Sequence, residues 1–436
     1  MKDKRIYLDY AASTPVDPAV KKAMDPYFSE TFANAGALHW QGQQASAAVF
    51  KSRDTIAKAI GAQYNEVIFT GSATEANNLV LRGVLRGFRV QGLGFSEKKQ
   101  KIPIGYTLHP RIIVSSVEHE SVLETCRDLA ASLKEASLDP EGREKEGVEV
   151  IYIPVNRDGI IDLKKLKAVL NERTILVSIM YVNNEVGTIQ PISKITKIIS
   201  DFRNRKSQIT NSKIQIKSNY QLPITNYPLF HTDAVQAIQY LDCNVDELGV
   251  DFMTLSAHKI YGPKGIGALY VKNQKFGGDL IAPIITGGGQ EYSLRSGTEN
   301  TPSIVGFAKA VEINEKLKNS EAKRVRTLRE YLLKGLKKIN PKIMLNGSMK
   351  ERIPNNLNIY FPGHLAADLL IKLDLAGVAV SPGAACSARA MRSSYVLEAM
   401  GLPHQRCVGS LRITLGRQTK KGELERFVRI LKQASI

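Results

Sequence analysis

The sequence has few of the residues that cross-link a chain or anchor it in a membrane. It contains only four cysteines, at positions 126, 243, 386 and 407, which are too far apart to form the closely spaced pairs typical of metal sites. No run of 18 apolar residues occurs, so no membrane-spanning helix is expected. Asp9 interrupts the first apolar stretch, and no signal peptide is read there. We therefore expect a cytoplasmic protein with reduced thiols.

Acidic residues are scarce relative to basic ones. The chain has 60 Lys and Arg against 42 Asp and Glu, a net charge of +18. Such a surface can attract RNA, acidic proteins or a phosphate-bearing cofactor. The basic residues are scattered and no nucleic-acid-binding module is recognisable, so we favour a solvated lysine-rich surface and expect no stable nucleic-acid complex.

Length and patterning predict an α/β protein with more than one core. A chain of 436 residues is long for a single domain, so two are expected. Near-continuous apolar strands alternate with helical patterns, which predicts a mostly parallel sheet covered by helices on both faces. The expected strands include 66–70, 111–115, 148–153, 174–180 and 266–271, and the expected helices include 45–60, 163–170 and a Lys/Arg-rich helix from about 318. We interpret three weakly patterned stretches as surface loops: 87–110, 131–147 and 203–228.

Lys259 gives the first chemical signal. It follows an apolar, strand-like run and the residues Ser256, Ala257 and His258, and it precedes a Gly-Pro turn. A lysine at such a strand end can be partly desolvated, which lowers its pKa and frees the amine for Schiff-base chemistry. The alternative is an ordinary solvated lysine beside a turn.

Other polar residues also follow predicted strands. Residues 70–74 lead through a small-residue turn into a helix, whose N-terminus could bind phosphate or be simply capped. His119 has an imidazole suited to proton transfer, although a lone histidine is more often structural. Asn184 stands where a turn is usual. Arg412 lies in a short apolar strand, where its guanidinium could bind a carboxylate or form a surface salt bridge.

Cys386 lies in a loop of small residues, 381–390. Such a loop can bring a thiolate to a substrate, and the small neighbours favour the access that a reactive cysteine needs. The alternative is a small buried thiol. The other three cysteines occur in helix- or turn-like contexts, and we interpret them as structural.

Together these segments resemble the cysteine desulfurases, which are pyridoxal-phosphate (PLP) enzymes of the class V aminotransferase family. The resemblance extends from residues 7–15 (Tyr-Leu-Asp-Tyr-Ala-Ala-Ser-Thr-Pro) to residues 412–417 (Arg-Ile-Thr-Leu-Gly-Arg). It implies PLP-dependent fold type I, with a mostly parallel seven-stranded sheet between helices in a large domain of residues 16–317. A smaller α/β C-terminal domain, residues 1–15 and 318–436, would carry the cysteine loop.

The resemblance implies a role for each candidate residue. Lys259 would bind PLP and remove the substrate Cα proton, His119 would stack on the pyridine ring and shuttle protons, and Cys386 would receive the sulfur. Asp233, otherwise a helix cap, would face the ring nitrogen, with Gln236 at the phenolic oxygen. The implied phosphate ligands are Ala73, Thr74, Ser256, His258 and Thr298, and the implied substrate-carboxylate ligands are Asn184 and Arg412. No metal is expected.

The implied activity converts L-cysteine into L-alanine and leaves a persulfide on Cys386 for an acceptor or scaffold protein. Thr298 would reach across the interface of a homodimer. The loop continuing through residues 391–397 resembles that of the long-loop subgroup, which is associated with iron–sulfur cluster assembly and tRNA thiolation. A selenocysteine lyase or an aminotransferase of the same fold would use Lys259 but leave Cys386 idle. A non-catalytic basic RNA-binding protein would use only the charge.

Overall fold

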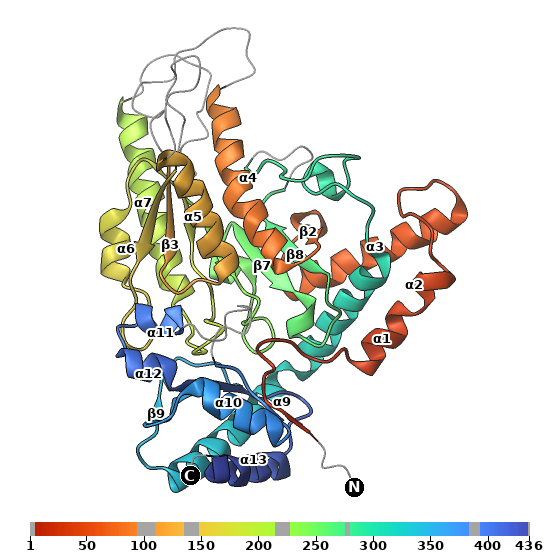
Figure 1. The fold of residues 1–436 in the computed structure, drawn as a ribbon. Helices are drawn as coiled ribbons and strands as arrows, with labels where there is room; N and C mark the ends of the chain where they lie inside the picture. The colour runs from red at the N-terminus through yellow and green to blue at the C-terminus, as the bar shows by residue number, and fades with distance from the viewer. Residues whose placement is uncertain are drawn as a thin grey trace.

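The computed structural model describes residues 5–93, 110–134, 148–213, 227–274, 280–382 and 393–434, and its central feature is a seven-stranded sheet (Figure 1). The strand order is β2-β8-β7-β6-β5-β3-β4. Only β8 runs antiparallel to its neighbours within this sheet, so the predicted mostly parallel sheet is confirmed. The strands are β2 (Val67–Thr70), β3 (Arg111–Ser115), β4 (Glu149–Ile153), β5 (Thr174–Ser178), β6 (Leu229–Asp233), β7 (Phe252–Ser256) and β8 (Gly267–Val271).

Helices cover both faces of this sheet, because successive strand residues point to opposite sides. In β3, Ile112 and Val114 belong to one apolar core and Ile113 to the other. One core includes α4 (Ala73–Leu93) and α5 (Glu120–Lys134). The other includes α3 (Trp40–Ala59), α6 (Leu163–Val169), α7 (Ile192–Lys213), α8 (Val245–Leu248) and part of α9 (Thr301–Ile339). Two short helices, α1 (Pro18–Met24) and α2 (Pro26–Ser29), precede α3.

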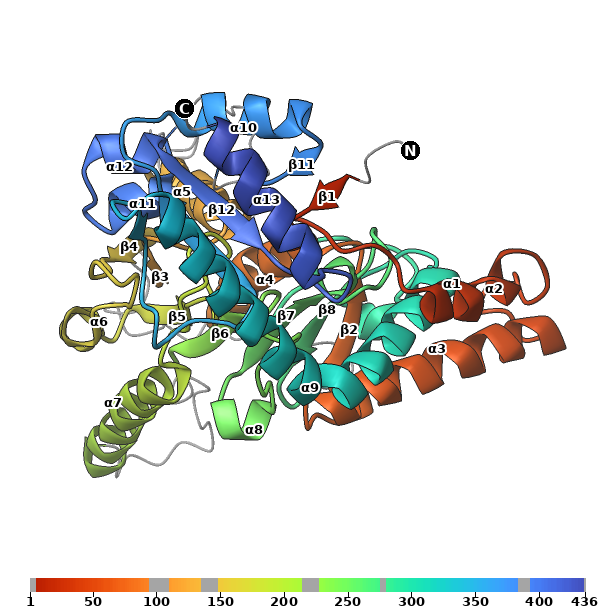
Figure 2. The ribbon, with the colours of Figure 1, turned by 90° about the horizontal axis from the view of Figure 1, so that it is seen from below.

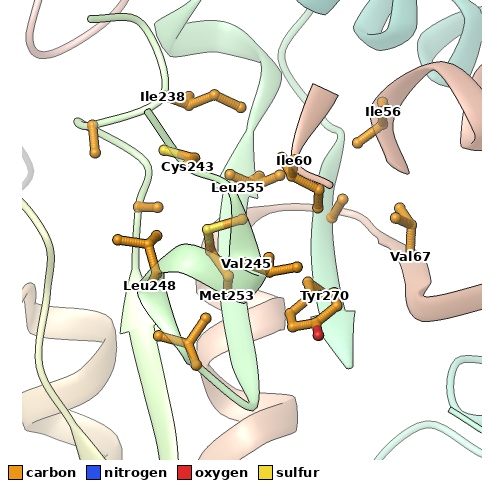
Figure 3. Packing of buried hydrophobic residues seen from close by; sticks show 14 of the residues in the cluster. Ile56, Ile60, Val67, Ile238, Cys243, Val245, Leu248, Met253, Leu255 and Tyr270 are labelled. Carbon is orange, nitrogen blue, oxygen red and sulfur yellow. The ribbon is translucent and has the colours of Figure 1, made fainter. Parts of the chain in front are cut away.

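Figure 3 shows part of the second of these cores. Ile56 of α3 and Ile60, which directly follows this helix, lie beside side chains of the sheet, among them Leu255 and Tyr270. Both isoleucines are fully buried. Burying a side chain of this size contributes about 1.5–3 kcal/mol, so this face fixes α3 firmly against the sheet.

A separate core lies in the C-terminal part of the chain (Figure 2). It contains an antiparallel sheet, β12-β10-β9, and a parallel pair, β1-β11, through which the first residues of the chain join this part. The elements around this core are β1 (Ile6–Tyr7), β9 (Met344–Leu345), β10 (Asn356–Tyr360), α10 (Ala366–Leu375), β11 (Val378–Ala379), β12 (Ser410–Thr414) and α13 (Lys421–Ala434). The short helices α11 (Tyr395–Ala399) and α12 (His404–Val408) pack instead in a further small cluster with Val117 and Val186.

Helix α9 passes from one core to the other. Phe307 packs in the core of the large sheet, whereas Leu332 and Leu336 pack in the C-terminal core. The prediction that this helix begins near residue 318 is wrong, since it begins at Thr301. Asn300 caps it by accepting a hydrogen bond from the Ser303 N–H, with a proline in the first turn. The Lys/Arg-rich composition marks only the later turns of the helix, whereas Asn300, Thr301 and Pro302 form its start signal.

Several predicted loops are partly helical. Helix α4 continues to Leu93, α5 to Lys134 and α7 to Lys213, and α3 begins at Trp40 rather than at residue 45. None of the extensions contains proline, and a helix that has already begun can add residues without an apolar stripe. Weak patterning was therefore a poor sign of a loop. Residues 94–109, 135–147 and 214–226 lie outside the described part of the chain.

Candidate active site

A cavity of about 170 Å³ opens at the carboxyl ends of the parallel strands. Strands β6 and β7 end at Asp233 and Ser256, and the segments after β3 and β5 carry His119 and Asn184. Parallel strands end at one edge of a sheet, so these separate segments converge there. The predicted site residues that line this cavity are Ala73, Thr74, His119, Asn184, Asp233, Gln236, His258, Lys259 and Arg412.

The first turn of α4 forms one wall. Ser72 caps the helix by accepting a hydrogen bond from the Glu75 N–H at 3.1 Å, and Thr74 lies in the first turn. A Cβ on Gly267 would lie 2.9 Å from Ala73 N, which shows that glycine is needed for β8 to approach this turn. The backbone N–H groups of Ala73 and Thr74 lie in the first turn of α4, where they have no carbonyl acceptor within the helix. These free donors suit the turn to bind an anion.

Lys259 ends a short 3₁₀ turn, η4 (Ala257–Lys259), directly after β7. Its Nζ donates to the carbonyl oxygens of Ala11 and Ala12 at 2.6 and 2.7 Å. The amine is therefore fixed by the N-terminal segment. Next to it, burial and then the positive charge of Lys259 lower the pKa of His258 to about 4, so His258 is neutral at pH 7.

Asp233, at the end of β6, and Gln236, three residues later, line the same cavity. The Asp233 carboxylate accepts from Val235 N at 3.0 Å and from Asn77 Nδ2 at 2.9 Å. Gln236 Nε2 donates to the Ala11 carbonyl at 3.1 Å. Asp233 caps the turn that follows β6, as the alternative interpretation expected, and it also lines the cavity.

Arg412 is buried in β12, with 2 % of its surface exposed, so a purely surface role is excluded. Its Nη1 donates to the Asn184 carbonyl at 3.0 Å and its Nη2 pairs with Asp9 at 2.8 Å. Arg412 Nε and Asn184 Oδ1 are both buried without a hydrogen-bond partner among the described residues. Orphaned buried polar atoms of this kind indicate a site built for a polar ligand.

Two buried acids adjoin the site residues. Glu118 precedes His119, and burial raises the pKa of its carboxyl to about 8 despite hydrogen bonds from Ser115 and Met180 N. Burial also raises the pKa of Glu185, which follows Asn184. Ser394 Oγ donates to Glu185 at 2.5 Å, and the other Glu185 oxygen has no partner in the described part of the chain.

Three predicted residues are not among the cavity lining. Ser256 is buried at the end of β7, Thr298 is exposed, and Cys386 lies outside the described residues. Conversely, several lining residues were not predicted, among them Ala11, Ala12, Asn77, Ser121 and Tyr395. Asn77 could have been found, because it lies one helical turn after Ala73 and shares its face. Cys126, Cys243 and Cys407 are buried, which agrees with a structural role.

Comparison with known proteins then places the chain in a family. The sequence pattern described as Aminotransferase class-V matches residues 6–205 and 224–427. The chain belongs to the class-V aminotransferase family. The predicted family is thus confirmed over most of the sequence.

Individual relatives extend this finding. The cysteine desulfurase IscS of Dictyoglomus turgidum is 39 % identical over 430 residues, covering 99 % of this chain and 94 % of the relative. Cysteine desulfurase IscS 1 of Archaeoglobus fulgidus is 37 % identical over 426 residues, covering 98 % and 95 %. A solved NifS-like protein has a TM-score of 0.79 at 32 % identity and covers 98 % of both chains. SspA in complex with cysteine has a TM-score of 0.68 at 31 % identity, covering 94 % of this chain and 98 % of its own.

Proposed function

We propose that this class-V aminotransferase family member is a PLP-dependent cysteine desulfurase. It would remove sulfur from L-cysteine, release L-alanine and keep the sulfur as a persulfide on Cys386. The observation that carries the proposal is that Lys259, Asp233 and Arg412 line one cavity beside the N-terminus of α4. Full-length relatives named cysteine desulfurase and a related structure holding cysteine support it.

The residues present fit PLP. The first turn of α4 suits the phosphate, the Asp233 carboxylate suits a ring nitrogen, and the Lys259 amine suits the aldehyde. Asn77 Oδ1, Asn184 Oδ1 and Arg412 Nε have no partners among the described residues, as expected where a polar ligand completes the site. The residues that would hold the cofactor are Ala73, Thr74, His119, Asp233, Gln236, Ser256, His258 and Lys259, with Thr298 from a second subunit.

The protein side of the reaction follows from these positions. When bound, PLP supplies an electron sink for the charge that develops on the substrate Cα. Arg412 and Asn184 orient the substrate carboxylate, so the Cα–H bond is presented to Lys259. The Lys259 amine, held by two carbonyls, attaches the cofactor and, once freed, takes the Cα proton.

Sulfur transfer requires Cys386. Its thiolate attacks the substrate sulfur, forming an S–S bond while the Cβ–S bond breaks. The electron pair of the broken bond stays with the three-carbon fragment, which takes up a proton at Cβ and leaves as L-alanine. The persulfide is then passed to an acceptor protein, and we include iron–sulfur cluster assembly in this proposal.

The proposal includes a homodimer. Large apolar side chains are exposed around α2 and α3: Phe28 (63 %), Phe32 (62 %), Leu38 (91 %) and Trp40 (66 %). Exposed apolar side chains gathered in one part of a chain favour a protein interface. Thr298 is also exposed, and a residue that contributes to the active site of a partner subunit has to be accessible in the single chain. The proposed domains are residues 16–317, and residues 1–15 with 318–436; the separate C-terminal core supports this division.

A cytoplasmic location is also proposed, supported by the three buried, unpaired cysteines. None of the helices in the described ranges is long and apolar enough to cross a membrane. The long-loop assignment remains a proposal, because residues 383–392 lie outside the described chain.

Product analysis tests the activity. Purified chain, PLP and L-cysteine should give equal amounts of L-alanine and, with a reductant present, sulfide. Activity on L-selenocysteine alone would favour a lyase, and a keto acid product would favour an aminotransferase. Absence of PLP binding together with RNA binding would favour the non-catalytic alternative.

A further inference from the structure

A continuous hydrogen-bond path joins Asp233 to His119, and both residues line the cavity. Asn77 Nδ2 donates to Asp233 Oδ2 at 2.9 Å and to Ser121 Oγ at 2.8 Å. Ser121 Oγ lies 2.9 Å from His119 Nδ1, and the Ser121 backbone N–H donates to the same nitrogen at 3.1 Å. The two linking residues, Asn77 and Ser121, have no role in the reaction described above.

The direction of each hydrogen bond follows from the chemistry of the groups. Both Asp233 oxygens accept from N–H donors, so the Asn77 group that faces Asp233 is its NH₂. An NH₂ group has two hydrogens, and the second one is directed to Ser121 Oγ. The Ser121 oxygen is therefore an acceptor toward Asn77, and its own hydrogen is free to be donated to His119 Nδ1.

His119 Nδ1 consequently receives two donors, the Ser121 hydroxyl and the Ser121 backbone N–H. A neutral imidazole with an accepting Nδ1 carries its proton on Nε2. A proton on Nδ1 would oppose the backbone N–H, which cannot rotate away. Asn77 is fully buried, so its hydrogen bond to Asp233 is shielded from competing water.

We propose that Asn77 and Ser121 are positioning residues that hold His119 as the neutral Nε2–H tautomer and connect it to Asp233. The inference deepens the proposed desulfurase function and rests on it only for its catalytic consequence. With Nδ1 accepting from Ser121, His119 would act as a hydrogen-bond donor through its Nε2–H. Asp233 would orient Asn77, Asn77 would orient the Ser121 hydroxyl, and Ser121 would orient the imidazole.

The charges near His119 are known from the elements around it. Glu118 and Glu120 are its neighbours in the sequence, and the charge of His119 influences the pKa of Glu185. The other charged residues that line the cavity are Asp233, Lys259 and Arg412. The substitutions below leave all of these charges in place. A change in the titration of His119 would therefore report the loss of a hydrogen bond.

Histidine-labelled chain without cofactor can be followed by NMR across a pH series, with His119→Gln identifying the His119 signals. The unaltered chain should show Nε2 protonated and Nδ1 unprotonated. In Ser121→Ala the neutral form loses one donor, worth about 0.5–1.5 kcal/mol, so protonation should become about 2- to 10-fold easier. The His119 midpoint should move to higher pH. Ser121→Thr, which keeps the hydroxyl, should restore the parent midpoint.

Ser116→Ala is the matched control, because it also removes a hydroxyl, three residues before His119 in the sequence, but one without a hydrogen-bond partner among the described residues. Its midpoint should equal the parent value. Asn77→Ala should shift the midpoint in the same direction as Ser121→Ala, because the hydroxyl loses its fixed orientation. A parent His119 with its proton on Nδ1, or an unchanged midpoint in folded Ser121→Ala, overturns the proposal.

Activity adds a separate readout. In loaded enzyme, Ser121→Ala should lower kcat for alanine formation severalfold and leave KM for L-cysteine unchanged, since Ser121 does not bind the substrate carboxylate. A raised KM with unchanged kcat counts against the proposal. If the parent forms no alanine at all, the proposed function fails, while the NMR titration still decides the roles of Asn77 and Ser121.

Discussion

The Arg412 guanidinium and the Asp9 carboxylate lie 2.8 Å apart, although 403 positions separate them in the sequence. Asp9 holds Nη2 and the Asn184 carbonyl holds Nη1, so the plane of the guanidinium is fixed. Nε is left buried without a partner in the described chain. The N-terminal segment, the C-terminal sheet and the cavity are thereby joined at one side chain.

Replacing Arg412 should weaken substrate binding more than cofactor binding. Arg412→Lys keeps the charge but loses the planar fork, and a hydrogen bond to a charged group is worth about 1.5–3 kcal/mol. We expect KM for L-cysteine to rise about 10-fold or more, with PLP affinity unchanged. Steady-state kinetics and PLP titration measure both quantities. Arg173→Gln, in a half-exposed pair with Glu149, is the control and should match the parent.

Glu118→Gln should change how stability depends on pH. Burial raises the pKa of this acid from 4.5 to about 8, so the folded chain keeps a proton that the unfolded chain loses. This stabilisation is complete below pH 4.5 and is lost as pH rises toward 8. Glutamine cannot ionise, so the variant should gain stability relative to the parent over that range, by about 2 kcal/mol or more. Urea unfolding midpoints at pH 5 and pH 8 measure this, and parallel curves for the two chains would contradict it.

Lys259→Ala should abolish covalent attachment of PLP and all turnover. The reason is that, among the described residues that line the cavity, Lys259 is the one that carries a lysine amine. Borohydride treatment with PLP, followed by peptide mass analysis, measures attachment directly. The control is Lys264→Ala, an exposed lysine five residues further along the chain, which should retain both properties. If borohydride still fixes PLP covalently to the Lys259→Ala chain, the assignment of Lys259 as the cofactor-binding lysine is wrong.

Mixed subunits should reveal a shared site if Thr298 serves the neighbouring subunit. Lys259→Ala and Thr298→Glu chains should each be inactive, the second because a carboxylate would repel the phosphate. A mixed dimer then has one site with both changes and one with neither, so up to about half of the activity of a parent dimer should return. Pairing Lys259→Ala with the double variant provides the control, where no activity should return. No recovery in the first mixture despite proven exchange, or an active monomer, contradicts the shared site.

Much of the fold could be predicted because most strands of the large sheet are buried on both faces. Their near-continuous apolar runs place β2, β3, β4, β5 and β8 within two residues of their observed bounds. Polar residues directly after such strands gather at one edge of a parallel sheet, so Asn184, Asp233 and Lys259 could be expected to meet. The resemblance added the precise roles.

The remaining features depend on contacts that local patterns do not contain. The Ala11 and Ala12 carbonyls reach Lys259 across 248 and 247 residues, and their backbone oxygens carry no sequence signal. In the sequence, Ser121 has the pattern of an ordinary first-turn helix residue. Its hydrogen bond depends on Asn77 of a different helix, whose Nδ2 lies 2.8 Å from Ser121 Oγ. The start of α9 differs from these cases, because its signal is local: Asn300 caps the helix, whereas the Lys/Arg-rich composition begins only in later turns.

The central claim is that sulfur passes from L-cysteine to Cys386. Chain loaded with PLP should be mixed with one equivalent of L-cysteine without reductant, and then analysed by peptide mass and alanine assay. One sulfur should be found on the peptide containing Cys386 for each L-alanine formed, and Cys386→Ser should carry none. Sulfur on Cys126, Cys243 or Cys407 instead, or alanine formed at the parent rate by Cys386→Ser, would contradict the account.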